Sequence, residues 1–319
     1  MRRRCRLGWW TVWAAGCATP VGMDDVRIVD QASYTAACDA ILGEVWPLDC
    51  ASADEVPVEV TGADGVRLAQ SLADLEGGFR CDQPSALSHC VPGSRVKVGQ
   101  TSAGVPYVLV CRKYNERPDD PGGYDQIGVV ASDPDSGATC YWSTPEDGLR
   151  RGDPLPKPGS AADLGWGSRS FWYTLPELRQ APCTACHDND PWIHTPWIHR
   201  MDIPSAPLAP TWLVGADALG WPAQRRLVHP DAAPCTGCHA LAEGRSCELA
   251  LDAAGRKSWA MPVSTAFSAW PRSHWMDDFD HEVLQTRYAD AAAWDARWGA
   301  AVEVIAGCCS GERVEGCWE

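Results

Sequence analysis

Cys183-Thr184-Ala185-Cys186-His187 and Cys235-Thr236-Gly237-Cys238-His239 are two copies of one pattern, in which two cysteines flank two residues and a histidine follows at once. Residues 188–234 lie between the copies. That separation is too long for a zinc ribbon, whose two cysteine pairs lie about 15–20 residues apart. A thioredoxin-like redox pair would need a βαβ pattern, which the surrounding Pro-rich and Trp-rich sequence lacks. The two copies therefore carry a different chemistry.

Two thiols at this spacing can both add to the vinyl groups of one haem, and the adjacent histidine then reaches the iron. Each copy therefore predicts one covalently attached haem. The predicted anchors are Cys183 and Cys186 for the first haem and Cys235 and Cys238 for the second, and the predicted iron ligands are His187 and His239.

With these motifs, the region from about residue 165 to 319 resembles c-type cytochromes that carry two haems. The resemblance implies two haems of type c as cofactors, a mainly α-helical fold for this region and electron transfer between redox proteins as its activity. The expected fold class is thus α+β, with a disulfide-stapled, β-rich N-terminal domain followed by a mainly α-helical diheme cytochrome c-like domain.

The sixth iron ligands decide between electron transfer and catalysis. For the second haem we expect Met276, which precedes a long helix, with Met261 as the alternative. For the first haem the candidates lie in or near a five-residue repeat, Pro191-Trp192-Ile193-His194-Thr195 followed by Pro196-Trp197-Ile198-His199-Arg200. The prolines exclude a regular helix, so the repeat should be a loop against the haem. His194 is the first choice, and the alternatives are His199, Met201 and His229.

The N-terminal sequence predicts export. Four arginines precede the short apolar run Leu7 to Ala15, as in a signal peptide. Ala14-Ala15-Gly16-Cys17 resembles a bacterial lipobox, which predicts removal of residues 1–16 and a lipid on Cys17; the alternative is a plain secretory cleavage. We therefore expect an exported lipoprotein in the periplasm or outer membrane, or at the cell surface.

Charge and hydropathy limit the partners. The formal net charge is -15, so a phosphate backbone would be repelled and nucleic acid is not an expected partner. Beyond the signal region the sequence has no apolar run long enough for a membrane span, so we expect membrane contact only through the lipid at Cys17. The expected partners are redox proteins of the cell envelope.

Sixteen cysteines are present, and ten of them lie outside the signal peptide, lipobox and CxxCH motifs. An even number in an exported chain predicts up to five disulfides. Short loops suggest Cys38–Cys50 and Cys81–Cys90. We further expect Cys111–Cys140, and pairing of Cys247 within the group Cys308, Cys309 and Cys317.

Local patterns predict the organisation of the chain. Residues 24–150 should form the β-rich domain, with strands at 95–98, 105–111, 126–131 and 138–142 and one helix through Leu68, Leu72 and Leu75. The Pro- and Gly-containing stretch 151–167 should be a linker, and 168–319 the haem domain. The longest helix should run from about Asp278 to Ala306 and stop at Gly307.

The 17 tryptophans are unusual, and most lie after residue 160. They either exclude water around haem or pack in an ordinary core.

Three functions fit these features. The first is a diheme electron carrier rather than an enzyme. The second is a diheme redox enzyme of the peroxidase type, in which one iron has an open position. The third is an envelope binding protein whose N-terminal domain recognises a partner while the haem domain reports on it.

Overall fold

The computed structural model describes most of the chain after the N-terminal segment. The described residues are 27–75, 81, 91–180, 183–185, 187–188, 190–193, 196–198, 201–205, 211–221, 225–236, 240–244, 246–247, 291–310 and 315–318.

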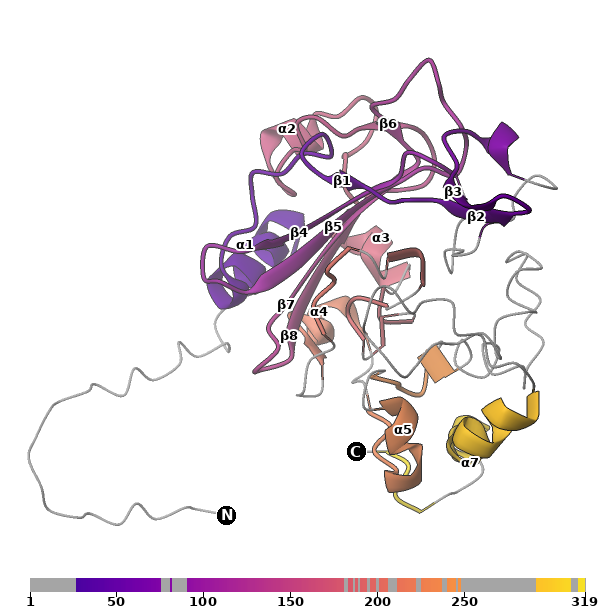
Figure 1. Cartoon of the computed structure of the whole chain (residues 1–319). Coiled ribbons are helices and arrows are strands. Elements are labelled where there is room, and N and C mark those ends of the chain that lie inside the picture. The colour runs from indigo at the N-terminus through magenta and orange to yellow at the C-terminus, as the bar shows by residue number, and fades with distance from the viewer. Residues whose placement is uncertain are drawn as a thin grey trace, which may run out of the picture.

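A six-stranded sheet forms the centre of the structure, in the order β1-β4-β5-β7-β8-β10 (Figure 1). Neighbouring strands are antiparallel except β8 and β10, which are parallel. The four predicted strands are confirmed as β4, β5, β7 and β8. The strand bounds are β1 Asp54–Glu55, β4 Arg95–Gln100, β5 Pro106–Arg112, β7 Gln126–Ser132, β8 Ala138–Ser143 and β10 Trp212–Leu213.

Two small hairpin-like sheets and several short helices surround the main sheet. The small sheets are β2 (Glu59–Gly62) with β3 (Gly65–Leu68), and β6 (Gly123–Tyr124) with β9 (Arg150–Arg151). The α-helices are α1 Gln31–Leu42, α2 Ala161–Leu164, α3 Leu175–Gln180, α4 Ala216–Leu219, α5 Ala233–Thr236 and α7 Ala291–Cys309. Single 3-10 turns are η2 Leu72–Asp74, η4 Cys183–Ala185, η5 Pro196–Ile198 and η6 Pro230–Ala232.

The predicted fold class is wrong. The chain is a mixed α/β fold, and its second half is not a mainly α-helical diheme cytochrome c-like domain. Strand β10 from that half completes the main sheet, and α3, α4 and α5 span only one or two turns each. The physical reason is the density of proline and glycine between residues 181 and 237, which interrupts helices.

The helices differ from the sequence predictions in several places. The long C-terminal helix is described as α7, Ala291–Cys309, and it continues through Gly307 instead of stopping there; residues 278–290 lie outside the described residues. The helix predicted through Leu68, Leu72 and Leu75 is wrong, because Leu68 ends β3 and Leu72 begins a single 3-10 turn. Helix α1 was not predicted, although Asp30 and Ser33 form a capping box at its start.

Two faces of the main sheet pack against different parts of the chain. The first face presents Leu109, Ile127, Val129, Cys140 and Trp142, and it belongs to a large core that also contains α1 residues such as Tyr34 and Leu42. Helix α1 lies along this side of the sheet (Figure 1).

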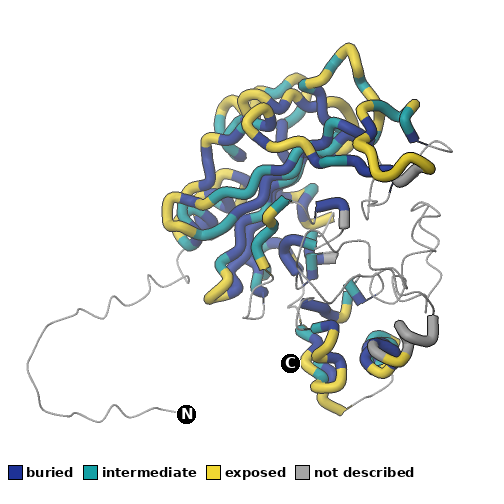
Figure 2. The backbone as a smooth tube through the Cα atoms, in the orientation of Figure 1, coloured by how far each residue is buried: buried dark blue, intermediate teal, exposed yellow. Residues whose placement is uncertain are grey.

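The second face presents Val96, Val108 and Val130, which pack against Trp192, Trp197 and Ile198 of the five-residue repeat. Because both faces are covered, the central strands are buried along much of their length (Figure 2).

The segment that we expected to be a linker, residues 151–167, packs on the large core. Leu155 is buried and bridges to Leu48, and Asp163 is buried at the end of α2. Phe171, Trp172 and Leu175, which follow it, belong to the same core as the strands. One core thus runs through residues before and after this segment.

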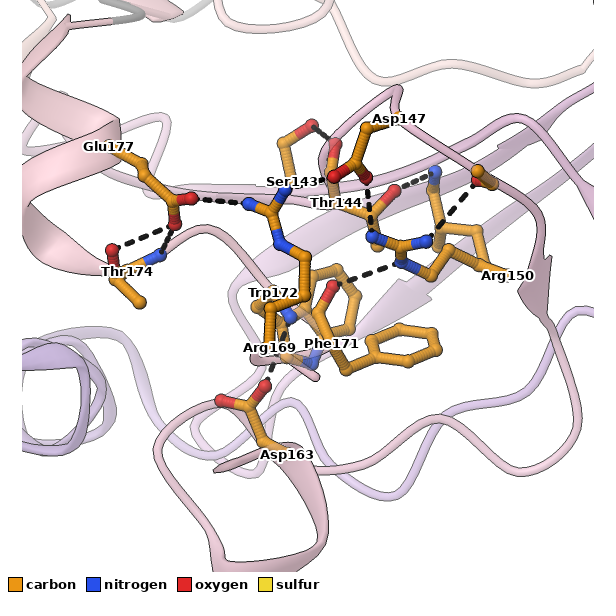
Figure 3. A network of polar contacts seen from close by, with 12 residues as sticks. Ser143, Thr144, Asp147, Arg150, Asp163, Arg169, Phe171, Trp172, Thr174 and Glu177 are labelled. Carbon is orange, nitrogen blue, oxygen red and sulfur yellow. Dashed lines mark hydrogen bonds and ion pairs between the residues drawn. The ribbon is translucent and has the colours of Figure 1, made fainter. Parts of the chain in front are cut away.

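A polar network fixes the chain just before the first CxxCH motif (Figure 3). Buried Arg150 pairs with Asp147 and donates to the Phe171 carbonyl. Arg169 pairs with both Asp147 and Glu177, and Glu177 caps the start of α3 by accepting from the Thr174 N–H. The network ties α3 to the turn after β8.

Disulfides join distant segments. Cys38–Cys140 links α1 to β8, Cys50–Cys111 links a loop to β5, and Cys247–Cys309 and Cys308–Cys317 join the C-terminal segments. Disulfide bonding and the predicted pairing of Cys247 within the C-terminal group are confirmed, whereas Cys38–Cys50 and Cys111–Cys140 are wrong. Cys81 is disulfide-bonded, and its predicted partner Cys90 lies outside the described residues.

A separate core forms around α5 and α7, which lie together apart from the main sheet (Figure 1). Cys235 of the second motif is buried there with Leu227 and Leu241 and with Ala301 and Ile305 of α7. The disulfide Cys308–Cys317 closes this core from the end of α7.

Candidate functional site

The first CxxCH motif forms a compact turn after α3. Leu175 and Leu178 bury one side of α3, and Arg179 holds the Ala218 carbonyl through Nε and Nη2 at 3.0 and 2.7 Å. The 3-10 turn Cys183–Ala185 follows, and the His187 N–H donates to the Cys183 carbonyl at 2.9 Å. That bond closes one helical turn, which places Cys183 and His187 on the same side of it.

The His187 ring is held from two sides. Its Nδ1 lies 2.8 Å from the Pro191 carbonyl oxygen. Its ring centroid lies 5.3 Å from that of Tyr141, and the Tyr141 hydroxyl donates to the His187 backbone carbonyl at 3.1 Å. Tyr141 projects from β8 on the second face of the sheet, so a strand residue, a turn and the first residue of the repeat together orient this imidazole.

The ring is neutral at physiological pH, with a defined tautomer. Burial lowers the pKa of His187 to about 4, and the nearby Arg112 guanidinium also lowers it, while the bond to Pro191 opposes both. A carbonyl oxygen can only accept, so Nδ1 carries the proton. Nε2 therefore keeps its lone pair, which is the state in which imidazole binds a metal.

Two features of the second sheet face accompany this ring. Arg112 ends β5, donates from Nη1 to Gln126 Oε1 at 2.8 Å, and keeps a buried Nε with no hydrogen-bond partner among the described residues. Gly128 on β7 pairs with Val110 and Ser143, and a Cβ built on it would have one heavy atom within 4 Å, at 3.9 Å. The second face thus presents the guanidinium Nε of Arg112, which has no partner among the described residues, and open space above Gly128.

Asp188 connects the two motif-bearing segments. Its Oδ2 accepts from the Ser246 N–H at 3.2 Å, and Ser246 precedes Cys247, which is disulfide-bonded to Cys309 of α7. Burial raises the pKa of Asp188 to about 6, and its Oδ1 has no hydrogen-bond partner among the described residues. The chain after the second motif therefore contacts the residue next to His187.

The five-residue repeat covers the sheet. Trp192 and Trp197 are buried against Val56, Val96 and Val108 rather than left for a ligand. Ile193 has a φ of 48°, a left-handed conformation that β-branched residues rarely adopt, so the backbone at Ile193 is strained. His194 and His199 lie outside the described residues, and Met201 packs against the same cluster as the tryptophans.

The second motif is described only at its start. The 3-10 turn η6 is capped by His229, whose Nδ1 accepts from the Asp231 N–H at 3.2 Å, and it leads into α5 with Cys235 buried beside α7. That cap occupies one ring nitrogen of His229, one of the alternative ligands. The other predicted site residues lie outside the described residues: Cys186, Cys238, His239, Met261 and Met276, as does Cys17.

Sequence reasoning missed the residues that orient His187. Tyr141 lies in a predicted strand, and the alternation of β8 could have placed it on the face opposite Cys140 and Trp142. No sequence signal places Arg112 beside His187, because residues 112 and 187 meet only through the tertiary fold.

Comparison with protein-family models, curated proteins and solved structures found no match for the chain. Among the described residues, no three His, Cys, Asp or Glu side chains gather as a metal cluster. Within the same part of the chain, no helix is long and apolar enough to cross a membrane.

Proposed function

We propose that this protein attaches two haems covalently through its CxxCH motifs and carries single electrons between redox proteins of the cell envelope. The observation that carries the proposal is the state of His187. It directly follows the second motif cysteine, and it is neutral with its proton fixed on Nδ1 by Pro191. This is the preparation that an axial haem ligand requires.

The residues around His187 fit a haem. A haem iron takes four ligands from the porphyrin, so the protein needs to supply only axial ligands and no cluster of three side chains. Cys183 and Cys186 would hold the ring by thioether bonds, and the guanidinium of Arg112 would bind one of its carboxylates. When bound, the haem supplies a reversible one-electron couple. His187 would bind the iron, Tyr141 would fix the turn, and Trp192 would keep water from the sheet side.

The second attachment site follows by motif identity. Cys235, Cys238 and His239 repeat the order of the first site, and Cys235, on α5, already packs against α7. For the sixth positions we propose His194 at the first iron and Met276 at the second. A carrier needs both irons six-coordinate, because a filled sixth position leaves no site for substrate.

We propose a location in the cell envelope, which the disulfides support. The long-range disulfides Cys38–Cys140 and Cys50–Cys111 are typical of an oxidising compartment. We propose that residues 1–16 are removed and that Cys17 carries the lipid anchor.

The first experiment measures haem attachment. After expression with a haem-attachment system, the intact mass should rise by two haems, and acid-acetone should leave them on the chain. Cys183→Ser with Cys186→Ser should remove one haem. The matched control, Cys308→Ser with Cys317→Ser, removes two cysteines that form a disulfide and should keep both haems. Extractable haem, or bound zinc in its place, would contradict the proposal.

The second experiment separates carrier from enzyme. With both sixth positions filled, EPR should show two low-spin ferric irons, and reduction should be fast and reversible. Met276→Ala should make one iron high-spin and lower its potential. One high-spin iron in the wild type, together with turnover of hydrogen peroxide, would assign the protein as a peroxidase-type enzyme instead.

The third experiment tests the anchor. A palmitate analogue fed to expressing cells should label the wild type but not Cys17→Ser, because only a cysteine thiol accepts the lipid. An unlabelled wild type would mean plain secretion.

A further inference from the structure

A series of aromatic residues leads from His187 to the protein surface through ring contacts and one hydrogen bond at β8. On the second face of the sheet, the ring centroids of His187 and Tyr141 are 5.3 Å apart. The backbone N–H of Tyr141 donates to the hydroxyl of Tyr34 at 3.0 Å on the first face. The ring of Tyr34 lies 6.2 Å from that of Trp142, the residue next to Tyr141 on β8. The series therefore crosses the sheet at β8.

The series then runs through the first-face core. Trp142 lies 6.1 Å from Trp46, Trp46 lies 5.4 Å from Trp172, and Trp172 lies 5.2 Å from Phe171. Phe171 contacts Trp166 at 4.8 Å. We call Tyr141, Tyr34, Trp142, Trp46, Trp172, Phe171 and Trp166 the aromatic series.

The two ends of the series differ in exposure. Tyr34, Trp142, Phe171 and Trp172 are at most 2% exposed, whereas Trp166, at the far end, is half-buried between two exposed glycines of the turn after α2. One end thus contacts the proposed iron ligand, and the other can meet solvent.

Packing alone does not require this arrangement. Apolar aliphatic side chains fill cores as well, yet at each step from β8 to the surface this core places an aromatic ring against the next. Four of the rings are indoles, and two of them hold their N–H in hydrogen bonds: Trp142 to Thr35 Oγ1 at 3.2 Å, and Trp172 to the Pro156 carbonyl at 2.7 Å. An indole with its proton held can give up one electron without losing that proton.

We propose that the aromatic series is an electron route by which the reduced first haem repairs Trp166 after a strong one-electron oxidant in solution has oxidised its indole. This rests on the proposed haem at His187. The oxidant takes one electron from Trp166, and one electron then moves outward from the reduced haem through the tryptophans to Trp166, with Phe171 and the two tyrosines as bridges that keep their protons. The haem is left oxidised by one electron, and no ligand has to leave the iron. A redox partner of the proposed carrier then reduces the haem again. No bond forms or breaks along the series.

The experiment produces the oxidised surface tryptophan directly and follows its repair by the reduced haem. The full-length two-haem protein is reduced, and azide radicals from pulse radiolysis oxidise its exposed tryptophans. Indole-radical decay and haem oxidation are followed together. If the electron passes through the aromatic series, indole-radical decay and haem oxidation should proceed at the same rate. That rate should not depend on protein concentration.

Variants locate the path. Trp166→Phe keeps a ring against Phe171 but removes the oxidisable indole, so the concentration-independent phase should be lost or sharply reduced. Trp172→Leu should give the same loss from inside the core. The matched control is Trp212→Phe on β10: Trp212 is also half-buried, and its Nε1 donates to the Ser136 carbonyl, but it is not part of the series.

The outcomes are distinct. A phase unchanged in Trp166→Phe, or lost in Trp212→Phe, would overturn the proposed electron route while leaving haem attachment intact. Failure of Trp172→Leu to fold leaves Trp166→Phe as the deciding variant. An intact mass without haem would overturn both this inference and the proposed function.

Discussion

Asp163 should be a main determinant of the loop that carries Phe171 and Trp172. Its side chain is fully buried; Oδ2 accepts from the Gly159 N–H at 2.6 Å and Oδ1 from the Trp172 N–H at 3.0 Å. Figure 3 shows the carboxylate directed at the backbone of Trp172. Gly159 cannot move to find another acceptor cheaply, because a Cβ on it would lie 2.5 Å from the Ala32 backbone, which shows how closely the loop contacts α1.

Asp163→Ala leaves the buried N–H of Trp172 and the partly buried N–H of Gly159 without acceptors. Each costs about 1 to 3 kcal/mol. Part of that loss is offset, because the substitution also removes a carboxylate from a buried position. Burial outweighs the hydrogen bonds in setting the pKa of Asp163, which is raised above its usual 3.8. We therefore expect the free energy of unfolding to fall by about 2 to 4 kcal/mol, below the full sum.

The pH dependence has a definite sign. A carboxyl whose pKa is higher in the folded state binds its proton more tightly there than in the unfolded chain. Its contribution to stability therefore decreases as pH rises from 3.8 through the raised folded-state value, and is constant above that. Asp163→Asn removes this titration, so the difference in unfolding free energy between wild type and variant should change with pH only in that window.

Urea unfolding, followed by tryptophan fluorescence, measures both effects at a series of pH values. Asp163→Asn keeps one carbonyl oxygen as an acceptor and should cost less than Asp163→Ala. A loss below about 1 kcal/mol for Asp163→Ala, or equal losses in the two variants, would refute the reasoning that unsatisfied N–H groups dominate.

Two further changes probe the frame around the site. Replacing Cys38 and Cys140 by alanine opens a loop with a sequence separation of 102, so urea unfolding should show a loss of about 4 to 5 kcal/mol; replacing Cys308 and Cys317, which are only 9 apart, should cost less. Tyr141→Phe removes the hydroxyl that donates to the His187 carbonyl, and should lower the unfolding free energy by about 1 kcal/mol while leaving both haems on the chain by intact mass.

The four central strands of the main sheet could be predicted from the sequence, whereas the disulfides that link them to other segments could not. Strands β4, β5, β7 and β8 follow from apolar, β-branched runs between turn residues, which are local signals. Disulfide pairing depends on which strands meet. Cys38 pairs with Cys140 because α1 lies on β8, and a rule based on short loops could not anticipate this.

The fold predicted for the second half of the chain was wrong because the CxxCH motif was taken to imply a helical cytochrome fold. The CxxCH pattern at residues 183–187 predicts haem attachment within one turn of chain, and nothing in that turn requires neighbouring helices. The repeat illustrates the difference. Its prolines predicted a loop against the haem, whereas Trp192 and Trp197 pack on strands.

A sheet can meet the demands of an axial histidine as well as a helical bundle can. The ligand needs its Nδ1 proton held, its ring fixed and water kept away. Here a loop carbonyl at Pro191 holds the proton, and Tyr141, on a strand locked by the Cys38–Cys140 disulfide, fixes the ring. A strand residue beside the disulfide has little freedom to move, so this frame should resist reorganisation when the charge of the site changes. That rigidity follows from the cross-linked sheet, and it is what the proposed one-electron carrier would require.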